Sequence, residues 1–193
     1  MEKILVIQTA FIGDVILSTS LAEKLADYYP NARIDYLVKK GNESLLKNHP
    51  HIHKVWVFDK HKHKIRNLLN LLFLIRKESY CQVINVHRFL SSGLIAAFSG
   101  AKVISGYKKN PLSFLFIHRK PHYFQEGIHE VDRMLMLIED ITDKQFYKPA
   151  LYPQPDDYRF VPENRNYVCL APTSVWYTKQ WPLDKWVELI RLF

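Results

Sequence analysis

The sequence has few cysteines and few glycines. Only two of its 193 residues are cysteines, Cys81 and Cys169, and both adjoin apolar runs. A disulfide scaffold is small and rich in cysteine, so we expect two buried, reduced thiols instead. With six glycines, the chain also lacks the Gly-x-Gly-x-x-Gly pattern. That absence argues against an NAD or FAD site of the usual kind.

Long hydrophobic runs are also absent. The first apolar run, Ile4–Ile7, stops at Gln8 and is too short for a secretory signal. The richest stretch, Leu68–Ile75, falls far below the roughly 18–20 apolar residues that cross a bilayer. We therefore expect a cytoplasmic protein, with contact at the cytoplasmic face of the inner membrane left open.

The composition is that of a folded domain with a basic surface. Apolar residues make up 48% of the chain, which excludes a disordered or fibrous protein, and the net charge is +8. Basic residues gather in 39–66 and again at Lys108, Lys109, Arg119 and Lys120. Such charge attracts nucleic acid, an anionic membrane or a phosphorylated substrate, and charge alone does not choose among them.

Short apolar runs alternate with segments of helical periodicity over the first 141 residues. This alternation predicts a parallel sheet with helices on both faces, a Rossmann-like doubly wound α/β domain. Its ligand crevice lies at the carboxyl ends of the strands. The expected strands are 3–8, 33–38, 54–58, 82–86 and 103–107, and the expected helices are around 17–28, 64–77, 90–99 and 128–141.

A change of composition marks the end of this domain. Residues 147–165 contain four prolines and are typical of a linker. A further strand is expected from Tyr167, and a helix from about Leu183 that still continues at Phe193. We therefore expect a first lobe at 1–146, a Pro-rich linker at 147–165 and the beginning of a second lobe at 166–193.

The turn after the first strand, Thr9 to Val15, carries a single glycine, Gly13, followed by Asp14. One interpretation makes Asp14 an N-cap or first-turn residue of the next helix, where a carboxylate is favourable by about 1 kcal/mol. The other makes it a general base that takes a proton from a sugar hydroxyl at the mouth of the crevice. The two interpretations are compatible.

A second turn follows the strand expected at Tyr167. Thr173 and Ser174 supply hydroxyl groups, and Lys179 precedes a helix that Pro182 is suited to begin. Hydroxyl and backbone N–H groups beside a lysine are suited to a phosphate. An ordinary loop with a surface lysine explains the same residues equally well.

Four landmarks, in order, connect these segments to a known family. They are Gly13-Asp14-Val15 after the first strand, the strand-helix-strand segment Tyr80–Tyr107, the segment His129–Arg133, and Lys179-x-Trp181-Pro182. Together they resemble the lipopolysaccharide heptosyltransferases, glycosyltransferase family nine. The resemblance extends over essentially the whole chain.

The resemblance implies a two-lobed GT-B-type enzyme that moves heptose, or a related sugar, from ADP-heptose to a lipopolysaccharide core or another anionic glycolipid. It implies inverting, metal-independent transfer without a cofactor, and the sequence has no Asp-x-Asp motif. Asp14 would be the base, and Lys179 would offset charge on the departing ADP. Substrate contacts would come from Thr9, Gly13, His87, Arg88, Thr173 and Ser174. Because most of the second lobe is missing, we expect this stretch alone to be inactive.

Other functions remain open at this point. His49, His51, His53, His61 and His63 invite a metal site, but they lack carboxylate or cysteine partners at familiar zinc spacing, so no metal is expected. A nucleic-acid-binding module is suggested by the charge alone, without a recognisable motif, and we expect no nucleic-acid partner. A truncated, non-catalytic relative is a further alternative. Aromatic and basic residues between Tyr107 and Phe124 predict a membrane contact.

Overall fold

The computed structural model describes residues 2–60, 63–123, 126–159, 161, 166–174 and 176–193. Contacts divide the chain into unit 1, Met1–Pro153, and unit 2, Gln154–Phe193. The expected linker, 147–165, therefore contributes to both units, and its residues 160 and 162–165 lie outside the described residues.

Unit 1 is built on one parallel sheet of six strands in the order β3-β2-β1-β4-β5-β6. β1 lies between β2 and β4, so that Val6 pairs with Tyr36 on one side and Ile84 on the other. This confirms the predicted Rossmann-like fold class. The strands are β1 (Lys3–Gln8), β2 (Arg33–Lys39), β3 (Ile52–Phe58), β4 (Gln82–Asn85), β5 (Val103–Tyr107) and β6 (His118–Lys120).

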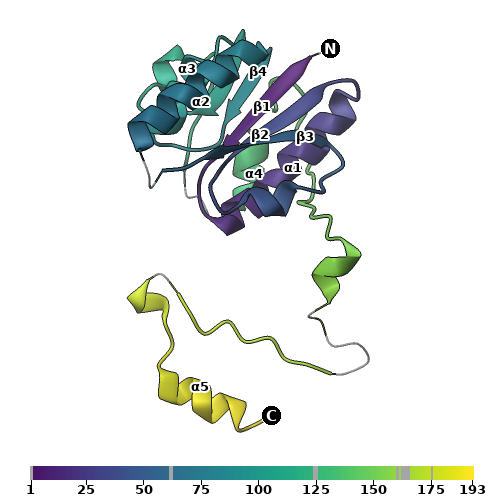
Figure 1. Cartoon of the computed structure of the whole chain (residues 1–193), viewed down its shortest axis with the longest axis vertical. Coiled ribbons are helices and arrows are strands. Elements are labelled where there is room, and N and C mark those ends of the chain that lie inside the picture. Colours follow the sequence, from purple (N-terminus) through teal and green to yellow (C-terminus); the bar gives the residue numbers. More distant parts are fainter. Residues whose placement is uncertain (1, 61–62, 124–125, 160, 162–165, 175) are drawn as a thin grey trace. The chain divides into compact units, whose positions relative to one another are not determined.

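Helices cover both faces of the sheet (Figure 1). Side chains alternate along a strand, so Ile4 and Val6 of β1 enter one core, whereas Leu5 and Ile7 enter the other. α1 and α4 pack on the first core, and α2 and α3 pack on the second. The helices are α1 (Ile12–Tyr28), α2 (Lys64–Glu78), α3 (Leu90–Ala97) and α4 (Glu130–Leu135).

The last part of unit 1 is fastened to α1 by polar groups. Lys24 is completely buried, and its ammonium donates to the carbonyl oxygens of Asp143 and Gln145, each at 2.8 Å. The Asp143 carboxylate lies 2.8 Å from the same ammonium. Further along, Ala150 N–H donates to Thr19 Oγ1 at 2.9 Å. The buried ammonium, which has three N–H groups, therefore lies 2.8 Å from three oxygen atoms of Asp143 and Gln145.

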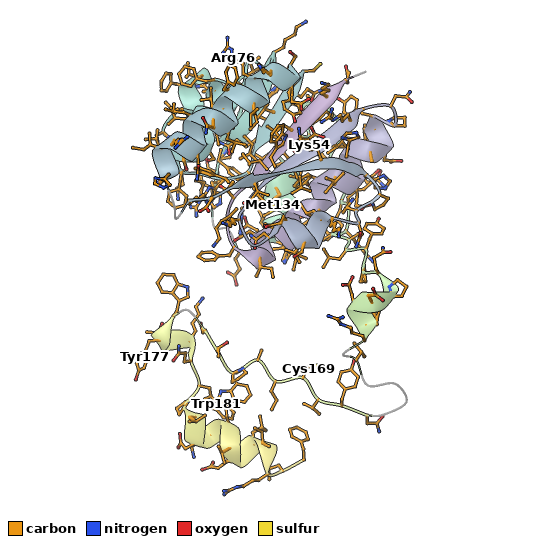
Figure 2. All side chains as sticks on the ribbon, viewed as in Figure 1. Lys54, Arg76, Met134, Cys169, Tyr177 and Trp181 are labelled. Carbon is orange, nitrogen blue, oxygen red and sulfur yellow. The ribbon has the colours of Figure 1, made fainter. Side chains whose placement is uncertain are left out.

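Unit 2 consists of short helical segments on an extended chain: η3 (Pro155–Tyr158), η4 (Tyr177–Lys179) and α5 (Leu183–Ile190). Figure 2 shows the side chains of Cys169, Tyr177 and Trp181 along this part. The described residues of unit 2 contain no strand, so the strand expected from Tyr167 is wrong. A strand needs a neighbour to accept its hydrogen bonds, and the described chain supplies none there. The last helix ends at Ile190, before the expected Phe193.

Two further expectations need correction, and one strand was missed. The helix expected at 128–141 is regular only over α4, and the chain then continues through turns with bonds such as Leu137 N–H to Met134 O, at 3.0 Å. These turns keep the apolar spacing, so Leu137 is still fully buried. β6 was not predicted, because its three residues, His118–Lys120, have no apolar pattern. Cys169 is exposed and Cys81 half-buried, because unit 2 has no core over Cys169.

None of the helices in the described part of the chain has the length and apolar character to span a bilayer.

Candidate functional site

A cleft of about 900 Å³ opens at the carboxyl ends of β1 and β4. The strand order reverses between these two strands, and open α/β sheets bind their ligands at such a point. The cleft belongs wholly to unit 1. Its lining includes Thr9, Asp14, Lys39, Lys60, Lys64, His87, Arg88, Phe89, His122 and Glu130.

Asp14 enters the cleft from the first turn of α1. Phe11, in extended conformation, is the N-cap, and its N–H donates to Asp14 Oδ2 at 3.1 Å. The first-turn interpretation is thus confirmed, with Asp14 three residues after the cap. The described residues give Oδ1 no hydrogen bond, so this oxygen is available to a ligand. Next to it, a Cβ added to Gly13 would meet no atom within 4 Å, which leaves open space above the start of the helix.

Hydrogen bonds of Thr9, which follows β1, connect it to the loops after β3 and β4. Lys60, just after β3, donates from its ammonium to the Thr9 carbonyl oxygen at 2.8 Å and to Thr9 Oγ1 at 3.1 Å. Thr9 Oγ1 lies 3.0 Å from His87 Nδ1. An ammonium has no acceptor, so the Thr9 hydroxyl accepts from Lys60 and directs its own hydrogen to Nδ1. We infer that neutral His87 carries its proton on Nε2.

Positive charge and burial dominate the electrostatics of the cleft. Burial, followed by the charges of Lys39 and Lys64, lowers the pKa of Lys60 to about 8. Burial, followed by the charges of Lys60 and Arg88, lowers the pKa of His87 to about 4. His87 is therefore neutral at pH 7, whereas Lys60 stays largely protonated. A group of cations crowded enough to lower a lysine pKa is suited to an anionic ligand.

Two buried side chains stabilise the loop that carries His87 and Arg88 by hydrogen bonds to its carbonyl oxygens. Asn110 Nδ2 donates to the carbonyl oxygens of His87 and Phe89 at 3.2 and 3.1 Å. Ser92 Oγ donates to the same two oxygens at 3.0 and 2.8 Å. Arg88 is half-buried and lines the cleft, and it forms no ion pair with the carboxylates in the described part of the chain.

Two carboxylates line the cleft, and they differ in their partners. The Glu130 carboxylate is paired with the guanidinium of Arg133 on the same helix. Asp14 accepts only the backbone N–H of its own helix cap among the described groups. Of these two carboxylates, Asp14 is thus the one that forms no ion pair with a described side chain.

The structure brings together the predicted residues of the first lobe, and those of the second lobe are described within unit 2 by itself. Thr9, Asp14, His87 and Arg88 line one cleft, and Gly13 adjoins it. Thr173, Ser174 and Lys179 belong to unit 2. There, Ser174 O accepts from Gln180 Nε2 at 2.7 Å, and the side chains of Thr173 and Lys179 are exposed.

Sequence reasoning missed Lys60, Ser92 and Asn110 as site residues. Lys60 was noted only for its charge, and no local pattern marks the other two. Two of these residues could have been found from their position in the predicted topology. Asn110 follows β5 and Lys60 follows β3, so both lie at the carboxyl edge of the sheet.

The histidine-rich segment forms part of the fold. His49 is buried, with Nε2 3.2 Å from Glu23 Oε1 and its ring 4.8 Å from that of Tyr152. Within the described residues, no three His, Cys, Asp or Glu side chains gather as metal ligands would. His61 lies outside the described residues.

Comparison with known proteins agrees with the fold and the motifs. Residues 69–193 match the profile of glycosyltransferase family 9 (heptosyltransferase). The chain is 26% identical over 199 residues to lipopolysaccharide heptosyltransferase 3 of Escherichia coli strain K12, covering 92% of this chain and 56% of that protein. It is 28% identical over 116 residues to lipopolysaccharide heptosyltransferase 1 of Campylobacter coli, covering 60% of this chain and 34% of that protein.

Solved structures show the same fold. A glycosyl transferase family 9 protein from Veillonella parvula superposes with a TM-score of 0.81 at 19% identity, over 97% of this chain and 58% of that chain. The E. coli heptosyltransferase WaaC with ADP superposes with a TM-score of 0.75 at 18% identity, over 98% of this chain and 64% of that chain. The chain thus spans little more than half the length of the lipopolysaccharide heptosyltransferase 3 relative.

Proposed function

This chain belongs to glycosyltransferase family 9, the heptosyltransferase family, and on that premise we propose that it transfers heptose from ADP-heptose to an anionic saccharide acceptor. The acceptor that agrees best with the names of the chain's relatives and with the chain's positive charge is the lipopolysaccharide core. The activity is that of a complete two-lobed enzyme, of which unit 1 is the acceptor lobe and unit 2 begins the donor lobe.

One observation carries the proposal: an available carboxylate, Asp14, lies in a cleft that is otherwise cationic. Lys39, Lys60, Lys64 and Arg88 line the same cleft, whereas Glu130 is already paired with Arg133. A sugar acceptor bearing phosphate or carboxylate groups would meet these cations and place a hydroxyl at Asp14. Neither a purely basic surface nor a lone acidic residue would do both.

The proposed chemistry is a single displacement. Asp14 Oδ1 accepts the proton of the acceptor hydroxyl as its oxygen attacks the anomeric carbon of the heptose. The new C–O bond forms on the face opposite the diphosphate, and the bond to ADP breaks with its electron pair on the leaving oxygen. The configuration is inverted, and no metal takes part. Because Oδ2 accepts the Phe11 N–H, the carboxylate is already oriented before the acceptor arrives.

Unit 2 would supply the donor side. Thr173, Ser174 and Lys179 lie within the residues that match the family, and we assign them to its nucleotide-sugar lobe. The Lys179 ammonium would offset the charge that develops on ADP, and the hydroxyls would donate to its phosphates. The solved relative that contains ADP supports a nucleotide ligand of this kind.

The experiment is ADP release from ADP-heptose with heptose-deficient lipopolysaccharide core, using the longest natural form of this chain. Asp14→Asn keeps an oxygen for the Phe11 N–H but removes the base. We expect kcat to fall by about 10²- to 10⁴-fold with little change in stability. Equal acceptor-dependent release from both proteins would remove Asp14 as the base.

Asp132→Asn is a matched control. Asp132 occupies the same position in α4, where its Oδ2 accepts the His129 N–H at 3.1 Å, but it does not line the cleft. The two substitutions therefore weaken the same type of helix cap. Only Asp14→Asn is expected to lower kcat to this extent, and comparable losses in both variants would trace the effect to helix capping.

A further inference from the structure

Helix α2 carries apolar residues on its outer side as well as its inner side. Leu71 and Ile75 are buried in the core against the sheet. Ile65, Leu69 and Phe73 follow one another at intervals of four residues, and their exposed fractions are 74%, 60% and 58%. Residues four apart lie on one side of a helix, so these three form a continuous apolar stripe facing away from the core.

Positive charge borders this stripe. Arg66, Arg76 and Lys77 are exposed on the same outer half of the helix, and the Lys77 ammonium lies 4.7 Å from the centre of the Phe73 ring. The acidic residue of α2, Glu78, is half-buried and turned to Lys3 and Lys54, whose ammonium groups lie 3.1 and 3.0 Å from its oxygens. The outer side of α2 is thus apolar and cationic, without an opposing acid of its own.

We propose that the outer side of α2 docks on an anionic phospholipid membrane, with Ile65, Leu69 and Phe73 inserted among the lipids and Arg66 and Lys77 at the phosphates. A helix that combines large apolar side chains with basic ones lies in the plane of a membrane interface. The inner side of α2 stays packed on the sheet, so docking needs no unfolding.

The position of α2 relates this surface to the cleft. Lys64 and Leu68, from the first two turns of the helix, line the cleft. A membrane held by the outer side of α2 would therefore lie beside the entrance, within reach of a lipid-linked saccharide. The segment between Tyr107 and Phe124 is less suited to this role. Lys120 is engaged by Glu139 and Asp140, both at 2.8 Å, and Phe124 lies outside the described residues.

The test is co-sedimentation of the longest natural form of the chain with vesicles of phosphatidylglycerol and phosphatidylethanolamine. The variant Ile65→Gln/Leu69→Gln/Phe73→Gln removes the stripe, and circular dichroism checks its fold. We expect its partition coefficient to fall about tenfold or more. A matched control, Phe114→Gln/Leu115→Gln/Ile117→Gln, changes three exposed apolar residues elsewhere in unit 1 and is expected to bind as the parent does.

Charge is tested separately. Arg66→Gln/Lys77→Gln is expected to weaken binding to these vesicles about tenfold, and the parent is expected to bind phosphatidylcholine vesicles far more weakly. Parent-like binding by the α2 stripe variant, or a loss confined to the control, would overturn the proposal. So would sedimentation velocity showing that the stripe variant dissociates a dimer, since the stripe would then join two copies. No sugar nucleotide is present, so failure here leaves the proposed transfer untouched.

Discussion

A Cβ atom placed on Gly93 would lie 2.3 Å from Oδ1 of Asn110. This separation is far below van der Waals contact, and Asn110 has no room to withdraw. Its amide nitrogen holds the His87 and Phe89 carbonyl oxygens, and its Oδ1 accepts the Leu112 N–H at 3.0 Å. The closeness of α3 to Asn110 therefore determines where the loop bearing Arg88 lies.

Gly93→Ala should destabilise the protein, although alanine favours a helix more than glycine does. We expect a loss of about 1–3 kcal/mol in the free energy of unfolding, because the buried Asn110 amide would lose its partners. Transfer activity should fall with it as the Arg88 loop moves. Urea unfolding and steady-state kinetics measure the two effects. Unchanged stability would mean that Asn110 can shift at no cost.

Gly13→Ala should behave in the opposite way. Nothing lies within 4 Å of the added Cβ, so the helix gains up to about 1 kcal/mol from its lower backbone entropy. The methyl group would nevertheless occupy the space beside Asp14. We expect KM for the acceptor to rise while the melting temperature stays equal or increases. An unchanged KM would show that the acceptor does not approach Gly13.

Binding of an anionic acceptor should weaken as pH rises through about 8, where Lys60 loses its proton. Lys60→Met should lower affinity for a phosphorylated core oligosaccharide about tenfold at pH 7 and remove most of this pH dependence. Isothermal titration calorimetry between about pH 7 and 9 checks it. Lys60→Arg, which stays charged, is the control. The same pH dependence in Lys60→Met would assign it to another group.

The effect of Lys60 on stability has the opposite sign. Its folded pKa, about 8, lies below the ordinary 10.5, so the unfolded chain binds more protons between these values. Stability from this group therefore rises as pH increases from 8 to 10.5, while anion binding declines. A parallel decline of both quantities would show that loss of binding reflects unfolding.

Acid should destabilise the fold in a window set by two histidines, His49, which is buried, and His87, which is half-buried. Burial lowers the pKa of His49 and His87 to about 4, below the ordinary 6.5. The unfolded chain binds more protons between pH 6.5 and 4, so this stability is lost as pH falls through that range. The pKa of Glu78 is lowered to about 2, mainly by its hydrogen bond to Lys54. Glu78 therefore contributes to the loss of stability only below pH 4.5, the ordinary pKa of this carboxyl group.

Urea unfolding at several pH values tests the assignment. His49→Gln and His87→Gln should each make the free energy of unfolding less steep in pH between about 6.5 and 4.5, and the double variant least steep. Each substitution also changes the free energy of unfolding by an amount that does not depend on pH, and comparing the slopes against pH removes this amount. A slope unchanged in the double variant would contradict the prediction.

Much of the first lobe follows from local sequence. Buried parallel strands are continuous apolar runs, and helices have their own period, so alternation of the two predicts the sheet and both helical layers. The topology then places the turn after Ile7 and the turn after Val86 at one crevice. This is why Asp14, His87 and Arg88 were found without any long-range information.

The remaining features depend on contacts between distant segments. Lys60 bonds to Thr9 across 51 positions of sequence, and Asn110 bonds to His87 across 23. No periodic pattern encodes such pairs. The failed strand at Tyr167 has the same origin, since an apolar run becomes a strand only beside another strand. The end of α4 at Leu135 could not be predicted either. Consecutive tight turns bury apolar residues at the same sequence spacing as a helix does, so the apolar pattern does not distinguish the two.

The bonds around Lys24 have a practical consequence for anyone who wishes to excise the acceptor lobe. A polypeptide ending before Asp143 would lose the three acceptors of the Lys24 ammonium together with chain that covers it, so α1 would lose this anchor. Residues 147–152 continue the fastening, since Tyr152 donates to Glu23 Oε1 at 2.9 Å. The lobe can thus be released intact only downstream of Tyr152, and a shorter fragment is expected to be poorly expressed and sensitive to protease.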